Sequence, residues 1–361
     1  MKIGILTFHR AHNYGAVLQC YALQEVLKGM GHEVEVIDYR QPWIEGFYSL
    51  FKFPTFNKQY PGFLDKLRYI KNLKWRKNIV DNKRIIFNDF INNNLQQSDK
   101  CKNMDDLRYD AIIIGSDQLW SPSCLGNQFD EIYLGYFSHN QSTKVIGFSI
   151  SSNSNSIKRL DLEYNINKIT KNFSSISFRE KEVAKLVGEI IGRQIPVTID
   201  PTLLTSSEQW DKLIDKNWSN KKYVVIYQIR TSDLSTENLY KNANKYITLH
   251  PDCSIVDLSH FSYSVRDFVS IIKYAQFVFT TSFHATAFSI IFKVPFYAFK
   301  LNDGHDVRYV DLLHTLGLTL CIKDIKETEL DYDNPYNHKS VCDKLIALQK
   351  DSYHYLSSSL H

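Results

Sequence analysis

The sequence has few of the residues that mark metal, redox or disulfide sites. Its 361 residues contain six cysteines, and no two of them form a C-x-x-C pair, so neither a zinc site nor a disulfide framework is predicted. The H-E-x-x-H and G-x-S-x-G patterns are also missing, which removes the commonest metalloprotease and serine hydrolase sites. We therefore expect no metal and no cofactor, and a reducing, cytoplasmic compartment.

Long apolar runs and a strong charge imbalance are missing as well. The most apolar stretch, Ala285 to Phe299, is interrupted by Lys293 and Pro295 and is shorter than the roughly 20 residues of a membrane span. A net charge of +4 is too small to indicate nucleic-acid binding without a concentrated basic patch. The one basic concentration, residues 64–84, fits either a helix on the inner face of the membrane or an ordinary solvated helix.

The sequence does show a regular alternation of strand and helix patterns. A strand over Ile3–Phe8, a helix over Ala16–Met30 and a strand over Val34–Tyr39 form a βαβ unit, which requires a parallel sheet. After a polar stretch the alternation restarts at Tyr223–Ile229, and the length of the chain exceeds that of one core. We predict an α/β fold with two Rossmann-like domains facing across a cleft, over residues 1–205 and 206–340, with a helix at 341–355 packing back on the first.

The loop after the first strand carries Asn13, Tyr14 and Gly15. It lies before the start of a helix, where free N–H groups and the helix dipole favour an anion. The loop has one glycine and no G-x-G-x-x-G pattern, which argues against a dinucleotide site. A tight turn with Asn13 as the helix cap is the alternative.

Ser116, Asp117 and Trp120 directly follow the apolar strand Ala111–Ile114. Open α/β sheets bind ligands at this carboxyl edge. Asp117 can bind or deprotonate a sugar hydroxyl, and Trp120 can stack on a sugar ring. A helix-capping role for Asp117 explains the same spacing.

Two arginines follow strands in equivalent positions, Arg179 in the first half and Arg230 in the second. The fixed fork of donors on arginine suits phosphate and carboxylate groups. A surface ion pair is the alternative for each of them.

A histidine stands where another predicted strand ends and a helix begins. Thr280, Thr281 and Ser282 close the strand, and His284 opens the helix. Histidine exchanges protons near neutral pH, which suits a reaction that protonates one carbon and deprotonates alcohols. A structural histidine at a helix start is the alternative.

Several short segments, taken in order, resemble the polysaccharide pyruvyltransferase family over nearly the whole length of the chain. The matching segments are His12 to Gln19, Tyr21 to Gln24, Tyr109-Asp110 leading to Gly115 to Trp120, Phe178-Arg179-Glu180, Asp200 to Leu204, and Ser282 to Ser289.

This resemblance implies a GT-B-like fold with substrates between two domains. It also implies phosphoenolpyruvate as the donor and a sugar acceptor, carried on a lipid-linked oligosaccharide for a capsule or exopolysaccharide. The two are joined as a cyclic pyruvate ketal with release of phosphate. By position, His284 matches the histidine of the family, Arg179 its arginine before an acidic residue and Asp117 its first-domain acid.

The chain departs from the family at Ser282, where better-described members have an arginine two residues before the histidine. We expect Arg308 to supply the missing charge, with Arg230 and Lys300 as alternatives. Two other functions stay open at this point: a glycosyltransferase that uses a nucleotide sugar, and a non-catalytic glycan-binding component of an assembly complex.

Overall fold

The structure is a computed structural model of the chain. It describes residues 1–48, 62–64, 66, 73–101, 104–138, 142–260, 262–327, 329–332 and 338–361. The predicted basic segment 64–84 lies partly outside the described residues, because 65 and 67–72 are not among them.

The N-terminal half forms a six-stranded sheet in the order β3-β2-β1-β4-β5-β6. Every neighbouring pair is parallel, as the βαβ pattern predicts. All four residues of β4 are buried, because helices cover both faces of a sheet of this kind. The strands are β1 (Lys2–Leu6), β2 (Glu33–Tyr39), β3 (Gln97–Cys101), β4 (Ala111–Ile114), β5 (Lys144–Ile150) and β6 (Ser175–Phe178).

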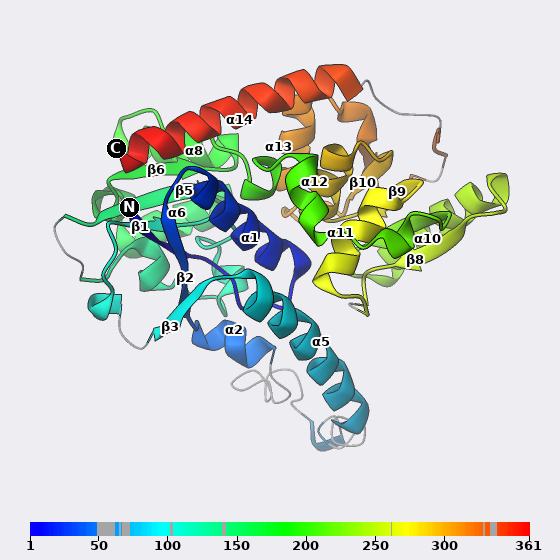
Figure 1. The fold of residues 1–361 in the computed structure, drawn as a ribbon, viewed down its shortest axis with the longest axis horizontal. Coiled ribbons are helices and arrows are strands. Elements are labelled where there is room, and N and C mark those ends of the chain that lie inside the picture. The colour runs from blue at the N-terminus through cyan, green and yellow to red at the C-terminus, as the bar shows by residue number, and fades with distance from the viewer. Residues whose placement is uncertain are drawn as a thin grey trace.

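The C-terminal half forms a second parallel sheet of five strands, in the order β11-β10-β9-β7-β8. The two sheets lie at opposite ends of the molecule, as Figure 1 shows. The predicted fold class, α/β with two Rossmann-like parallel sheets, is confirmed. The strands are β7 (Tyr223–Tyr227), β8 (Ser254–Asp257), β9 (Phe277–Thr280), β10 (Phe296–Lys300) and β11 (Ile322–Asp324).

Polar caps define where the helices next to the cleft begin. Asn13 caps the first of them by accepting hydrogen bonds from the backbone N–H groups of Gly15 and Ala16, which would otherwise have no partner. The helices are α1 (Tyr14–Gly29), α2 (Pro42–Phe47), α5 (Leu73–Asn94), α6 (Ser154–Tyr164), α7 (Ile166–Ile169), α8 (Lys181–Ile191), α9 (Ser207–Trp210), α10 (Asp233–Leu249), α11 (Val265–Tyr274), α12 (Phe283–Phe292), α13 (Val307–Leu316) and α14 (His338–Leu360).

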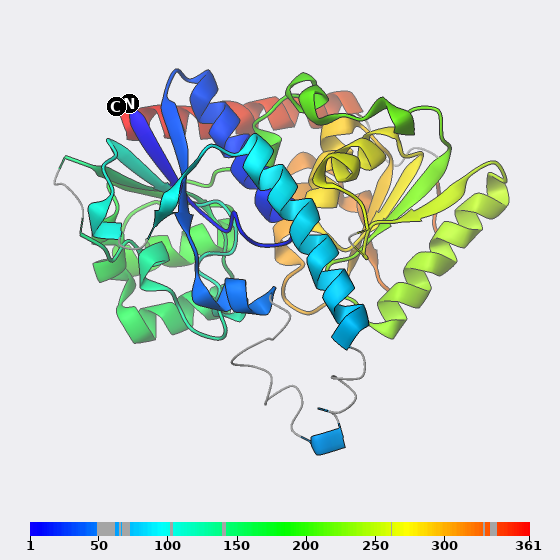
Figure 2. The same cartoon turned by 60° about the horizontal axis from the view of Figure 1, so that its bottom comes forward.

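One apolar core joins the two halves. It extends from β1 and α1 in the first half to α11 and α12 in the second, and α5 runs along this boundary beside α1 and α11 (Figure 2). The ring of Tyr14 stacks on Phe268 at 4.4 Å, and its hydroxyl donates to the carbonyl oxygen of Tyr263 at 2.7 Å. The relative position of the domains is therefore held by packed side chains.

The C-terminal helix α14 spans both sheets (Figure 1). At one end Lys344 donates to the carbonyl of Leu316 in α13 at 3.2 Å. At the other end the hydroxyl of Tyr355 donates to the carbonyl of Gly147 in β5 at 2.9 Å. None of the described helices combines the length and the apolar character that a membrane-spanning segment requires.

Candidate active site

A cavity of about 330 Å³ lies between the two domains. Residues that follow β1 and β4 line it from the first domain, and residues that follow β7 and β9 line it from the second. Both parallel sheets therefore turn their carboxyl edges toward it, as open α/β folds do toward their ligands. Its polar lining includes Asn13, Asp117, Gln118, Arg230, Thr281, Ser282, His284, His305 and Arg308.

His284 lies in the first turn of α12 and is 4% exposed. Ser282 caps this helix, with its hydroxyl accepting from the backbone N–H of Ala285 at 3.5 Å. The imidazole packs across the domain boundary against the first turn of α1, because a Cβ atom added to Gly15 would lie 1.9 Å from its Nδ1 atom. Gly15 thus makes room for His284, and Ser282 starts the helix that carries it.

This contact predicts that Gly15→Ala lowers the free energy of unfolding by about 2 kcal/mol, because the new methyl group must displace a packed ring. Gly29→Ala at the other end of α1 is the matched control, since its added Cβ would meet nothing within 4 Å. Urea unfolding of both variants measures the difference. Equal stability of the two variants would show that His284 does not pack on α1.

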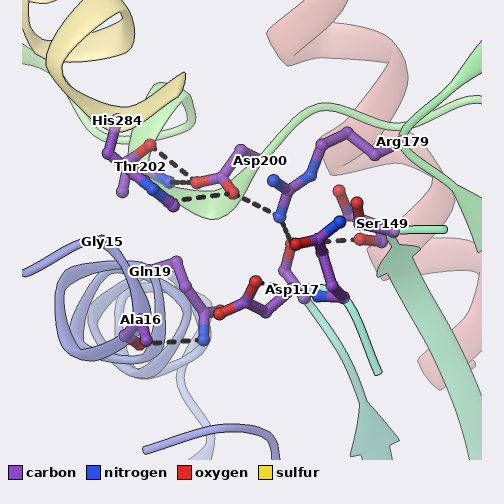
Figure 3. A network of polar contacts seen from close by, with 12 residues as sticks. Gly15, Ala16, Gln19, Asp117, Ser149, Arg179, Asp200, Thr202 and His284 are labelled. Atoms are coloured by element: carbon purple, nitrogen blue, oxygen red, sulfur yellow. Dashed lines mark hydrogen bonds and ion pairs between the residues drawn. The ribbon is translucent and has the colours of Figure 1, made fainter. Parts of the chain in front are cut away.

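Asp200 is a site residue that the sequence analysis did not select. Its side chain is fully buried and lies between Arg179 and His284, which approach it from different sides (Figure 3). One carboxylate oxygen, Oδ2, is 2.5 Å from Arg179 Nη2 and 3.6 Å from His284 Nε2. The other accepts hydrogen bonds from the backbone N–H and the hydroxyl of Thr202, at 2.9 and 2.6 Å.

The charge state of Asp200 follows from these contacts. Burial alone would raise its pKa, but the guanidinium of Arg179 and then the imidazole of His284 hold the pKa of this carboxyl well below its usual range. The side chain is therefore a carboxylate at neutral pH. The distance of 3.6 Å to His284 Nε2 is longer than that of an ordinary hydrogen bond, and the contact is an ion pair when the imidazole is protonated.

Arg179 forms an ion pair with the carboxylate of Asp200 and does not line the large cavity. Its Nη2 atom also donates to the hydroxyl of Ser116, and its guanidinium lies 4.8 Å from the centre of the Phe283 ring. It faces a smaller cavity of about 40 Å³, whose lining includes Arg308 as well. In this structure Arg179 is thus separated from the large cavity, and it contacts Asp200 on the side away from His284.

Two arginines of the second domain line the large cavity, and they differ in their partners. Arg230 is paired with Asp303 at 3.0 Å and with Asp306 at 3.1 Å. Arg308, in the first turn of α13, has no carboxylate within 4.0 Å and no hydrogen bond at Nε among the described residues. Burial and then the charge of Arg179 lower its pKa, and the carboxylate of Asp117 opposes that shift. Arg308 therefore has donors available for an anion.

Asp117 lines the cavity from the first domain. Its backbone has a φ of +83°, a conformation that asparagine and aspartate adopt more easily than most residues. Its Oδ1 atom accepts from the backbone N–H of Gln118 at 2.8 Å. Lys300, the third candidate for the missing charge, lies at the end of β10 and does not line the cavity.

Three residues expected at the ligand are buried in the core. Tyr14 packs at the domain boundary, and the hydroxyl of Ser116 donates to the carbonyl of Ser149 at 3.0 Å. The Trp120 indole N–H donates to the carbonyl of Tyr133 at 3.0 Å, and its ring packs against Phe178. In this structure all three side chains pack against protein, and none of them lines the cavity.

The cavity has further walls that the sequence analysis did not identify. His305 lines it, and burial, followed by the charges of Arg230 and Arg308, lowers the pKa of this histidine. Its imidazole is therefore neutral at pH 7. Helix α2 and the residue after it contribute an apolar wall, formed by Trp43, Ile44, Phe47 and Tyr48.

A family model described as polysaccharide pyruvyl transferase matches residues 13–303. No curated protein matches the chain. Among solved structures, the UDP-GlcNAc 2-epimerase from Methanocaldococcus jannaschii is 9% identical with a TM-score of 0.48, covering 96% of this chain and 92% of that chain. UGT2 of Phytolacca americana, complexed with UDP-2fluoro-glucose and pterostilbene, is 11% identical with a TM-score of 0.46, covering 99% of this chain and 98% of that chain.

Proposed function

The chain belongs to the polysaccharide pyruvyl transferase family, an enzyme family, and from that premise we propose that it transfers pyruvate from phosphoenolpyruvate to a sugar. The acceptor is part of a polysaccharide or lipid-linked oligosaccharide precursor in the cytoplasm, and the products are a cyclic pyruvate ketal and phosphate. One observation carries the proposal: His284 and Arg308 of one domain and Asp117 of the other line the same cavity. A proton carrier, a cation and a carboxylate are the groups that this reaction requires.

Arg308 binds the donor in this proposal. Phosphoenolpyruvate carries a phosphate and a carboxylate, and the donor fork of arginine fits both. Arg230 already shares its charge with Asp303 and Asp306, so it contributes less. Arg308 on α13 thus binds the anionic donor in place of the family arginine, whose position is occupied by Ser282 in this chain. Residues 206–340 form the donor side, and residues 1–205 together with the returning C-terminal helix form the acceptor side.

His284 and Asp117 move the protons. The imidazolium of His284 gives a proton to C3 of the enol, and the electron pair of the double bond forms the new C–H bond, which leaves C2 electron-poor. The first sugar hydroxyl attacks C2 and loses its proton to Asp117. The bond between C2 and the phosphate oxygen then breaks, and the leaving phosphate takes the proton from Asp117. The second hydroxyl closes the ring at C2, and its proton restores the imidazolium of His284.

Asp200 acts as a positioning residue. Its carboxylate, 3.6 Å from Nε2 of His284, stabilises the charged imidazole that the first step requires. Arg179 in turn holds Asp200 in place through the 2.5 Å ion pair. The arginine before the acidic residue thus acts on the reaction through Asp200 and His284.

Phosphorus NMR tests the proposal. The protein is incubated with phosphoenolpyruvate, with and without a lipid-linked oligosaccharide, and in parallel with UDP-sugars. We expect inorganic phosphate to appear from phosphoenolpyruvate only when the saccharide is present. Release of UDP from a nucleotide sugar, or no release from any donor, would overturn the proposed function.

The role of Arg308 leads to a separate prediction. Arg308→Met should raise the KM for phosphoenolpyruvate by about 10- to 100-fold, the effect of losing a charge-assisted contact, and should leave the KM for the acceptor nearly unchanged. Arg108→Met is the control, because Arg108 lies at the surface outside the cavity lining and donates to the backbone carbonyls of Asp105 and Leu107. An unchanged KM for the donor in Arg308→Met would assign donor binding to other residues.

A further inference from the structure

The cavity has two chemically different faces. The charged part of the lining carries His284, Arg308 and Asp117. The apolar part is formed by Trp43, Ile44, Phe47 and Tyr48, which we name the α2 wall. Phe47 is 46% exposed although it is large and apolar. The proposed donor is small and anionic, so it needs the charged face and leaves the aromatic one without a ligand.

The α2 wall is built in a fixed arrangement. Gly126, with a φ of +75°, lies directly against the Trp43 indole, because an added Cβ would be 2.5 Å from Cδ2 of that ring. Helix α2 begins with Pro42 and is capped by Gln41, whose side-chain oxygen accepts from the backbone N–H of Ile44 at 2.8 Å. The Trp43 ring therefore packs against the backbone of Gly126, which has no side chain to displace it.

The following aromatic residues are ordered by ring contacts. The rings of Phe47 and Tyr48 are perpendicular at 5.1 Å, and the Tyr48 ring lies 4.7 Å from that of His12. Asp117 and Tyr48 line the same cavity, and burial, with a smaller contribution from the charge of Asp117, raises the pKa of the Tyr48 hydroxyl. An aromatic surface thus ends beside the carboxylate that receives a hydroxyl proton in the proposed reaction.

A pyranose ring has an apolar and a polar surface, as the lining of the cavity does. One face presents C–H groups, which pack on aromatic rings, and its edge presents hydroxyls, which need polar partners. We propose that the α2 wall is the acceptor subsite, where a pyranose ring stacks on Trp43 and Phe47 and directs its two reacting hydroxyls toward Asp117 and His284. This inference rests on the proposed function and adds the residues that select the acceptor.

Steady-state kinetics test the subsite. Trp43→Ala and Phe47→Ala should each raise the acceptor concentration for half-maximal rate by about 10-fold or more, the loss expected for one stacked ring. The KM for phosphoenolpyruvate should stay unchanged, and Trp43→Phe should restore part of the affinity. Gly126→Ala should reproduce the effect with Trp43 still present, because it displaces the ring. Tyr136→Ala is the control, since Tyr136 is exposed and does not line the cavity.

A binding measurement separates this inference from the reaction itself. The tryptophan fluorescence of the protein and of Trp43→Phe is titrated with methyl glucoside, methyl galactoside and methyl mannoside, and with UDP. We expect a saturable change with at least one pyranoside that is absent in Trp43→Phe. A change that depends on Trp43 but occurs only with UDP, or no such change with any probe, would overturn the inference.

The two hypotheses then fail in different ways. A pyranoside-dependent change in the fluorescence of Trp43, together with no phosphate release from phosphoenolpyruvate, would refute the proposed function and leave the α2 wall as a sugar site. Acceptor-dependent phosphate release with normal acceptor kinetics in Trp43→Ala and Phe47→Ala would refute the α2 wall alone.

Discussion

His284→Gln is expected to lower turnover by about two to four orders of magnitude, the range for loss of general acid–base help. Glutamine approximates the length of the histidine but cannot carry a proton to C3 of the enol. Because the ring packs in a space that Gly15 leaves open, the variant should fold and still bind phosphoenolpyruvate. Phosphate release measures turnover, and calorimetric titration with phosphoenolpyruvate measures donor binding.

Turnover and donor binding together separate a role of His284 in the chemical step from a role in donor binding. Low turnover with normal donor binding would assign His284 to the chemical step. Turnover near that of the unmodified protein would exclude His284 as the proton carrier, and His305, the other histidine of the cavity lining, would then be the candidate.

Asp200→Asn is expected to lower the free energy of unfolding at pH 7 by about 3–5 kcal/mol, because it leaves a buried guanidinium without its counter-ion. The carboxylate is fully buried and 2.5 Å from Arg179 Nη2. Removing both charges in Asp200→Asn with Arg179→Met should recover much of the loss. Asp252→Asn breaks an exposed ion pair with Lys222 and is the control, with little change expected.

The same pair predicts the pH dependence of stability. The pKa of Asp200 is lowered on folding, so its contribution is complete above the unfolded value of about 4 and is lost as the pH falls below it. Urea unfolding at several pH values should show the unmodified protein losing this stability below about pH 4, with a flatter profile for Asp200→Asn. Parallel profiles, with equal stability at pH 7, would show that Asp200 and Arg179 do not form the ion pair.

The fold could be predicted because its signals are local. A parallel strand covered on both faces has a continuous apolar run in its sequence, as Ala111–Ile114 does, and a short crossover allows one handedness. The sequence also predicts that His284, Asp117 and Arg308 belong to the site, and all three line one cavity. His284 lies four residues after the end of β9 and Asp117 three residues after the end of β4, and the carboxyl edge of a parallel sheet is where ligands bind.

The remaining parts of the site depend on contacts between distant segments. Asp200 matters because folding brings it between Arg179 and His284, and no spacing in the sequence indicates that. Trp120 follows a strand as a ligand residue would, yet its ring turns into the core and bonds to Tyr133. Trp43 reaches the cavity from α2, where Gly126, more than 80 positions later in the chain, leaves room for its ring.

In the proposed reaction the cavity between the two domains holds phosphoenolpyruvate beside a proton carrier. A crystal structure of His284→Gln with phosphoenolpyruvate tests it most directly. We predict an anionic group of the donor on the guanidinium of Arg308, C3 facing the side chain at position 284, and open space toward the α2 wall. Donor density outside this cavity, or density within it that does not touch Arg308, would contradict the account.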